Sequence, residues 1–202
     1  VYEAEQTSLW NEIEAGLGQG DFASAYDAYL EQWTQGEGGR FVEDRLLALG
    51  AAGVGHAQNA IDLAVEILER EPKHVGACLT LAALAQQEEE WGDAEKYLTR
   101  ASELLGNASN RHGQVGSQLA AARVAEKVDP ADAQANYEAT IQKDRTNVLA
   151  HHGLFRLHVR QENWEQARAV GLRLTRLDLD ASERAQILCE LGTICRDGLK
   201  DY

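Results

Sequence analysis

The sequence has few basic residues. Lysine and arginine together number 19, against 33 aspartates and glutamates, and the formal net charge at pH 7 is −14. A protein that binds nucleic acid through the phosphate backbone needs clustered lysine and arginine. The acidic balance therefore argues against a nucleic-acid partner.

Long hydrophobic runs are also absent. A transmembrane helix needs about 20 consecutive apolar residues, and no stretch of this sequence has that character. No secretory signal is visible at the N-terminus. We therefore expect no insertion into a membrane. The chain begins Val1-Tyr2 without an initiating methionine, so we expect a fragment of a longer protein.

Cysteine and proline are scarce as well. The three cysteines are an odd number at positions with helical spacing, so they give no disulfide framework. This usage favours a reducing compartment, and we expect a cytoplasmic protein. Pro72 is placed to end a helix, and Asp129-Pro130 to start one, with the aspartate as the N-cap.

Motifs for catalysis are missing too. There is no nucleophile elbow and no phosphate-binding glycine loop. We therefore predict that the chain is not an enzyme and has no cofactor. One alternative stays open, in which the chain is the regulatory arm of a larger enzyme.

The clearest pattern that is present lies between Val75 and Ala108. Two amphipathic helical patterns are joined there by a short polar turn at 87–90. The apolar positions of both helices recur at a spacing of three to four, and they are Cys78, Leu81, Ala82, Ala85, Trp91, Ala94, Leu98, Ala101 and Leu105.

The same pattern recurs along the chain with a period of 34 residues. Ala60 and Ala94 are 34 positions apart, and so are Ala133 and Ala167. The step from Ala94 to Ala133 is 39, so five residues are inserted, and we place them in a loop at about 109–113. The repeat units are then about 7–40, 41–74, 75–108, 114–147 and 148–181, followed by a partial sixth repeat or capping helix at 182–202.

These units resemble the tetratricopeptide repeat, a helix-turn-helix unit of 34 residues. The third unit supplies the small and bulky positions of the repeat, as quoted above, and the fifth supplies Leu154, Trp164 and Ala167. The fifth unit departs from the pattern with Phe155 where a small residue is expected and Gly171 where bulk is expected. We expect this exchange to splay its two helices.

The resemblance implies an all-α fold, an α-α superhelix or solenoid in which stacked units share one core. It further implies a protein-interaction scaffold that holds a peptide or helix of a partner in a concave groove lined by the first helix of each unit. The groove residues that it implies are Arg45, Leu49, Leu79, Gln86, Gln118, His152, Arg156 and Arg160. The basic clamp with which one subgroup of the family holds chaperone tails is not matched here.

Two interpretations of Arg156 and Arg160 stay open. On so acidic a chain they suit an acidic peptide partner, which they would hold through charge-assisted hydrogen bonds. Alternatively, they only pair with nearby carboxylates, as exposed arginines often do.

His151, His152 and His158 lie close together in one predicted helix and raise the question of a metal site with Cys189. Positions 151 and 158 are packing positions of the repeat, so we predict no metal. The last predicted helix keeps Ile187, Leu188, Leu191 and Ile194 apolar, after which 196–202 is predicted to be a turn. Its apolar surface would favour self-assembly into a homo-oligomer through the terminal helices.

Overall fold

A computed structural model describes residue 46 and residues 57–199 of the chain. Helices joined by short turns are the secondary structure of these residues, without strands among them, which confirms the predicted all-α class. The helices are α4 (Ala57–Arg70), α5 (Val75–Gln87), α6 (Trp91–Asn107), α7 (Arg111–Ala125), α8 (Pro130–Lys143), α9 (Val148–Arg160), α10 (Trp164–Leu174), α11 (Ala181–Thr193) and the π-helix η1 (Ile194–Leu199).

The chain divides into two compact units, Val1–Glu89 and Glu90–Tyr202. In the described part of the first unit, α4 packs against α5 and buries one side of its own helix, with Ala60, Leu63 and Ile67 almost fully covered. His74 is the N-cap of helix α5, and its Nδ1 accepts a hydrogen bond from the backbone N–H of Ala77 over 3.1 Å. The predicted first repeat and the first helix of the second fall outside the described residues, apart from residue 46.

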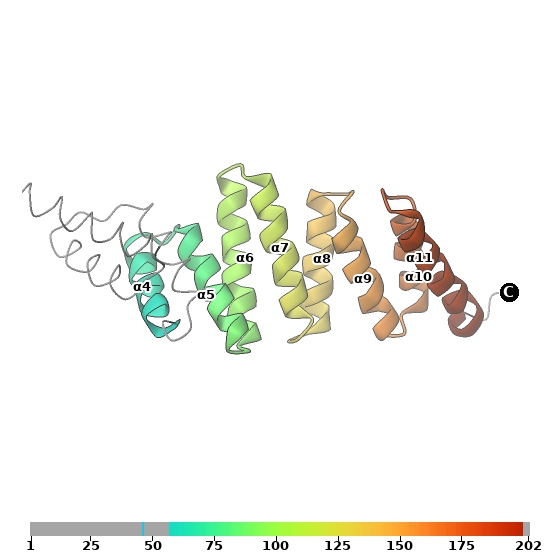
Figure 1. Cartoon of the computed structure of the whole chain (residues 1–202), viewed down its shortest axis with the longest axis horizontal. Coiled ribbons are helices and arrows are strands. Elements are labelled where there is room, and N and C mark those ends of the chain that lie inside the picture. Colours follow the sequence, from blue (N-terminus) through green and yellow to red (C-terminus); the bar gives the residue numbers. More distant parts are fainter. Residues whose placement is uncertain (1–45, 47–56, 200–202) are drawn as a thin grey trace, which may run out of the picture. The chain divides into compact units, whose positions relative to one another are not determined.

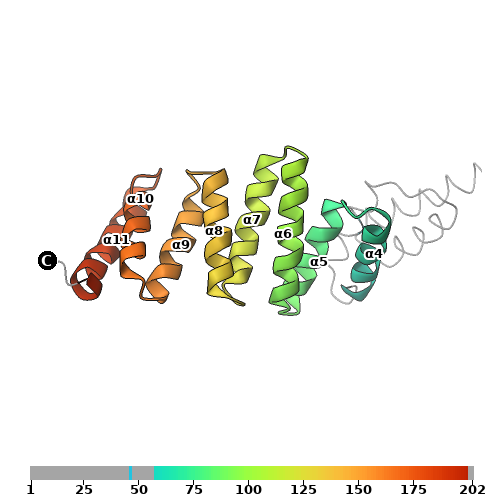
Figure 2. The same ribbon diagram turned by 180° about the vertical axis from the view of Figure 1, so that it is seen from behind.

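The second unit contains α6 to α11, which follow one another in space as they do in the chain (Figure 1, Figure 2). Each helix from α6 to α10 contacts the next, and α7 also contacts α9. The contact that skips α8 brings the first helices of successive pairs together on one surface. The largest side chains of the core behind it are Tyr137, Phe155, Leu157 and Leu174.

Short polar side chains fix where the helices of the second unit begin. Asp129 was predicted to be an N-cap, and its Oδ1 accepts from the N–H of Ala131 at 2.8 Å, with Pro130 in the first turn. Asp180 accepts from the N–H of Glu183 at 2.8 Å, and the Glu183 carboxylate accepts from the N–H of Asp180, which completes a capping box.

The five-residue insertion differs from the prediction. We expected a loop at 109–113, but the loop is limited to 108–110 and α7 already begins at Arg111. The reason is local, because Asn110 accepts from the N–H of Gly113 at 3.0 Å and so starts the helix three residues early. The inserted residues therefore lengthen a helix more than a loop.

Helices α9 and α10 approach closely at the point where we expected them to splay. Phe155 is fully buried, and a Cβ added to Gly171 would lie 2.9 Å from Cε2 of its ring and 2.7 Å from Cδ2 of Leu191. The large and small positions of this unit have therefore changed places. The ring of Phe155 takes the volume that a bulky residue at position 171 would fill.

The end of the described chain is helical and does not form the predicted turn. Residues 194–199 form the π-helix η1, which packs against α10 and α11. A Cβ at Gly198 would lie 2.7 Å from Cγ of Trp164, so glycine allows the backbone to approach the indole. Of the four apolar residues that the sequence singles out here, Ile187, Leu191 and Ile194 are buried and Leu188 is exposed.

Candidate functional site

A cleft of about 230 Å³ lies between α7 and α9. Leu119 and Arg123 line it from α7, and Leu149, His152 and Arg156 line it from α9. At its base the ring of Tyr137 lies over Gly153, where an added Cβ would come within 2.3 Å of the ring carbon Cζ. The absence of a side chain at position 153 therefore sets the depth of this cleft.

The cleft continues towards α11. A second cleft of about 250 Å³ shares Leu149 and His152 with the first and is lined on its far side by Glu183, Gln186 and Glu190. A third, of about 360 Å³, shares Arg156 with the first and Glu190 with the second. We call these three adjoining clefts the α7/α9/α11 groove.

Charges are distributed unevenly along the α7/α9/α11 groove. The α7 and α9 walls carry Arg123, Arg156 and Arg160, whereas the α11 wall carries Glu183 and Glu190. Leu149 of α9 lines both the cleft that contains Arg123 and the cleft that contains Glu183, and 66% of its surface is exposed. An exposed leucine between walls of opposite charge is a suitable contact for an amphipathic segment of another chain.

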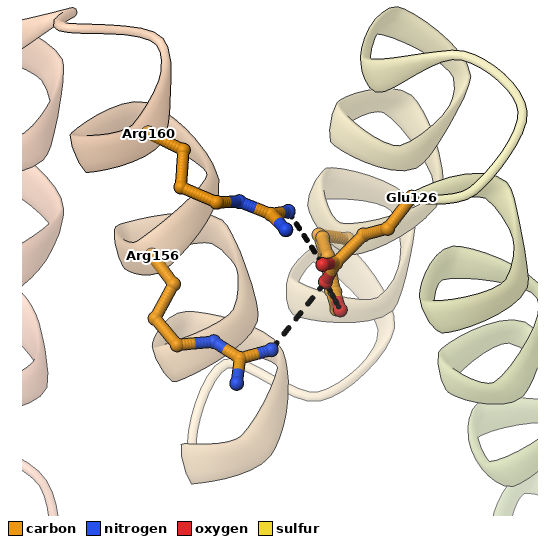
Figure 3. Close-up of polar contacts among 4 residues, drawn as sticks. Glu126, Arg156 and Arg160 are labelled. Atoms are coloured by element: carbon orange, nitrogen blue, oxygen red, sulfur yellow. Dashed lines mark hydrogen bonds and ion pairs between the residues drawn. The ribbon is translucent and has the colours of Figure 1, made fainter.

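Glu126, at the end of α7, holds two of the groove arginines (Figure 3). Its Oε2 accepts from Nη2 of Arg160 at 2.5 Å, and its Oε1 lies 3.6 Å from Nη2 of Arg156. Tyr137 donates its hydroxyl to the same Oε1 at 2.5 Å, and burial together with this bond raises the pKa of the phenol. The Glu126 side chain is only 10% exposed, while both arginines remain more than half exposed. Both arginines therefore pair with a carboxylate of this chain.

The structure places the other predicted groove residues in different settings. Arg45 and Leu49 lie outside the described residues. Leu79 is exposed on α5, and Gln86 is half-buried and donates to the carbonyl oxygen of Ala82. His152 lines the groove together with Arg156.

Gln118 is buried and was wrongly predicted to line the groove. Its Oε1 accepts from Ser102 at 3.0 Å and from Lys143 at 3.2 Å, and its Nε2 donates to Asn136 at 2.5 Å. Asn136 in turn donates to Glu95, whose pKa is raised by burial. These bonds use Gln118 to join α6, α7 and α8, so it is unavailable to a partner.

Sequence reasoning missed the groove residues of α11 and those of α7. On α7 the groove is lined one position further along than predicted, by Leu119 and Arg123. The α11 wall is formed by Glu183, Gln186 and Glu190. They lie in the segment 182–202, which the repeat pattern identifies only as a partial repeat or capping helix. The spacing of 183, 186 and 190 is a helical face, and this signal was available in the sequence.

The three histidines of α9 have separate environments. His151 and His158 are buried, His152 is exposed, and Cys189 is exposed on α11. Among the described residues, no group of three or more histidine, cysteine or acidic side chains is placed to hold a metal ion. None of the described helices is long and apolar enough to cross a lipid bilayer.

We expect the folded state to lose stability as the pH falls, because the imidazole of His158 is buried. Burial lowers the pKa of its imidazole below 6.5, opposed only by Glu138, and its buried Nδ1 has no hydrogen-bond partner among the described residues. The unfolded chain therefore binds the proton more readily, so this stability is present above about pH 6.5 and is lost as the pH falls below it. Urea unfolding at pH 7.5 and 5.5 measures the loss.

His158→Leu should reduce this difference between the two pH values, while His112→Gln, which changes an exposed histidine of α7, should not. An unchanged difference in the His158→Leu variant would show that other groups cause the pH dependence.

Comparisons with known proteins agree with this architecture. A tetratricopeptide repeat model matches residues 124–190, about a third of the chain. Yeast Tom70 superposes with a TM-score of 0.58 at 14% identity, over 94% of this chain and 39% of Tom70, so the chain spans well under half of that protein. MamA from MSR-1 superposes with a TM-score of 0.60 at 13% identity, over 90% of this chain and 98% of MamA.

A point mutant of MamA gives the same TM-score at 13% identity, over 88% of this chain and 100% of that one. At these identities the structural likeness shows the fold alone. Among curated protein sequences, none matches this chain.

Residues 124–190 therefore contain tetratricopeptide repeats, and the predicted resemblance is confirmed for this segment. Folds of this class generally mediate protein–protein interaction and are typically non-catalytic scaffolds. The matched segment covers most of α8 to α11, and thus most of the residues that line the α7/α9/α11 groove.

Proposed function

We propose that the chain is an interaction scaffold that binds a short segment of a partner protein in the α7/α9/α11 groove. The observation that carries the proposal is the continuity of the three clefts, which share Leu149, His152, Arg156 and Glu190. Stacked repeats present an extended surface, and such surfaces suit extended or helical segments.

The partner segment is expected to combine an apolar residue with an acidic one. Leu149 offers the exposed apolar contact at the centre of the groove. Arg123 lies on the same cleft and has no hydrogen bond or ion pair with any described residue, so its guanidinium is available to a carboxylate. Arg156, held to Glu126 by a single contact of 3.6 Å and 55% exposed, can join it.

The acidic wall sets the direction of the bound segment. Glu183 and Glu190 lie across the groove from Arg123 and repel a carboxylate. A segment with its acidic residue towards α7 and a neutral or basic residue towards α11 meets complementary charge on both sides. This arrangement contributes more to specificity than to affinity.

Selection of phage-displayed random peptides on the 202-residue chain tests the proposal. We expect the enriched peptides to share an acidic residue near an apolar one. Leu149→Asp should weaken their binding by about tenfold or more, because burying a charge against the groove loses the apolar contact.

Leu172→Asp is the matched control, since Leu172 is an exposed leucine on α10 that lines none of the three clefts. Equal binding to both variants would place the peptide elsewhere on the chain. Failure to enrich any shared pattern would remove short-peptide recognition from consideration.

A further inference from the structure

A separate pocket of about 450 Å³ lies outside the α7/α9/α11 groove and shares no lining residue with it. It is formed where the end of α8 and the end of α10 meet the first turn of α9. Arg145, Arg173 and Arg176 line it together with His151. Three of the 19 basic residues of a strongly acidic chain thus converge on one pocket.

Backbone geometry brings the arginines together. Helix α10 ends at Leu174, but the chain continues in a turn in which the N–H of Arg176 donates to the carbonyl of Arg173 at 3.1 Å. Residues three apart in such a turn project to the same side. Arg145 reaches the pocket from the segment that follows α8.

None of these three guanidinium groups makes a hydrogen bond or ion pair with any described residue. The nearest carboxylate in sequence is Asp144, and it is already occupied. It accepts from the hydroxyl of Thr146 at 2.8 Å and from Asn147 at 3.2 Å, and these bonds, the Thr146 hydroxyl first, lower its pKa. By contrast, Arg156, Arg160 and Arg196 each pair with a carboxylate.

His151 also lines the pocket. Its Nδ1 lies 2.9 Å from the carbonyl oxygen of Asn147, and because a carbonyl only accepts, this nitrogen carries the proton. Ile141 and Leu177 supply apolar wall beside the charged groups.

We propose that this pocket binds a phosphate monoester. A phosphate dianion has three terminal oxygens and matches the three planar guanidinium groups, whereas a carboxylate offers two oxygens and one charge. The apolar wall at Ile141 and Leu177 would contact the group that carries the phosphate. The pocket volume lies within the usual range for small-ligand sites.

A competing explanation is that the arginines only stabilise the C-terminal ends of α8 and α10, where positive charge complements the helix dipole. That role requires no ligand. The two explanations differ in whether the pocket binds a dianion saturably.

Isothermal titration of the 202-residue chain with phenyl phosphate, and separately with phenylacetate, tests the proposal. We expect saturable binding of phenyl phosphate and binding of phenylacetate that is weaker by about tenfold or more. Arg173→Gln with Arg176→Gln should weaken phenyl phosphate binding by a similar factor.

Lys73→Gln with Lys127→Gln is the control, because it removes two exposed positive charges elsewhere with the same change in net charge. Circular dichroism establishes that both double variants are folded. Absence of saturable phenyl phosphate binding, equal affinity for phenylacetate, or an equal loss in the lysine variant would each overturn the proposal.

Two further ligands identify the source of the phosphate. Tighter binding of a blocked phosphoserine tripeptide than of inorganic phosphate would indicate a phosphorylated protein segment. Equal or weaker binding of the tripeptide would indicate a small phosphorylated molecule.

Discussion

Gly153→Ala is expected to lower the free energy of unfolding by about 2–3 kcal/mol. The new Cβ would lie 2.3 Å from Cζ and 2.4 Å from Cε1 of Tyr137, far inside contact distance. Tyr137 is almost fully buried, and its hydroxyl is held by Glu126, so the ring cannot move aside without losing that bond. Urea unfolding followed by circular dichroism measures the change.

Gly116→Ala provides a sharp control within the same unit. Gly116 is in the middle of α7, and an added Cβ there meets nothing within 4 Å. Alanine favours a helix interior over glycine by about 1 kcal/mol, so this variant should be more stable than the wild type. A stabilising effect of both substitutions would show that Tyr137 does not press on position 153.

Reversing the charge of both Arg156 and Arg160 to glutamate is expected to cost about 2–4 kcal/mol of stability. Both side chains contact Glu126, whose carboxylate is 10% exposed, and the double variant would surround it with like charge. Since each arginine is more than half exposed, solvent screening keeps the effect in the lower part of this range. Thermal and urea unfolding measure it.

Arg173→Glu with Arg176→Glu changes the net charge by the same amount and breaks no ion pair with a described residue. It should cost less than about 1 kcal/mol. Equal destabilisation by the two double variants would mean that net charge, and not the Glu126 cluster, determines the effect.

The expected loss of stability in the Arg156/Arg160 double variant affects how binding experiments with it are interpreted. A loss of partner binding in the Arg156/Arg160 charge reversal would not by itself locate the binding surface, because the variant also weakens the packing of α7 against α9. Leu149 is a better position for such a test. Its side chain is 66% exposed on the groove and makes no polar contact.

The register of α7 is where sequence reasoning failed. Six buried positions of α5 correspond to buried positions of α7 that lie 40 residues later in the chain. Ala77 corresponds to Ser117 and Cys78 to Gln118. In the second helices the distance is 39, as between Ala94 and Ala133. A single step of 39 residues for both helices places Gln118 in the groove and leaves Arg123 out of it.

The periodicity of α7 could not have resolved this difference. Consecutive alanines at 120, 121 and 122 satisfy the small positions of the repeat in either register. Bonds from other helices decide between them. Gln118 is drawn inward by Ser102 of α6 and Asn136 of α8, which satisfy its amide and make its burial favourable.

The sequence by itself determined the all-α class and the spacing of the apolar positions in the described helices. Helix boundaries follow local chemistry, such as the caps at Asp129 and Asp180, and the apolar spacing identifies which sides are buried. These features depend on residues within one or two turns of each other, so a single sequence contains them.

Only the tertiary structure decided which charges are available. Glu126 meets Arg160 across 34 residues, and Phe155 fits against Gly171 because α9 and α10 pack there. Arg145, Arg173 and Arg176 converge on one pocket although they come from two different helix ends. Pairing and convergence depend on the packing of separate helices, which the spacing within each helix does not specify.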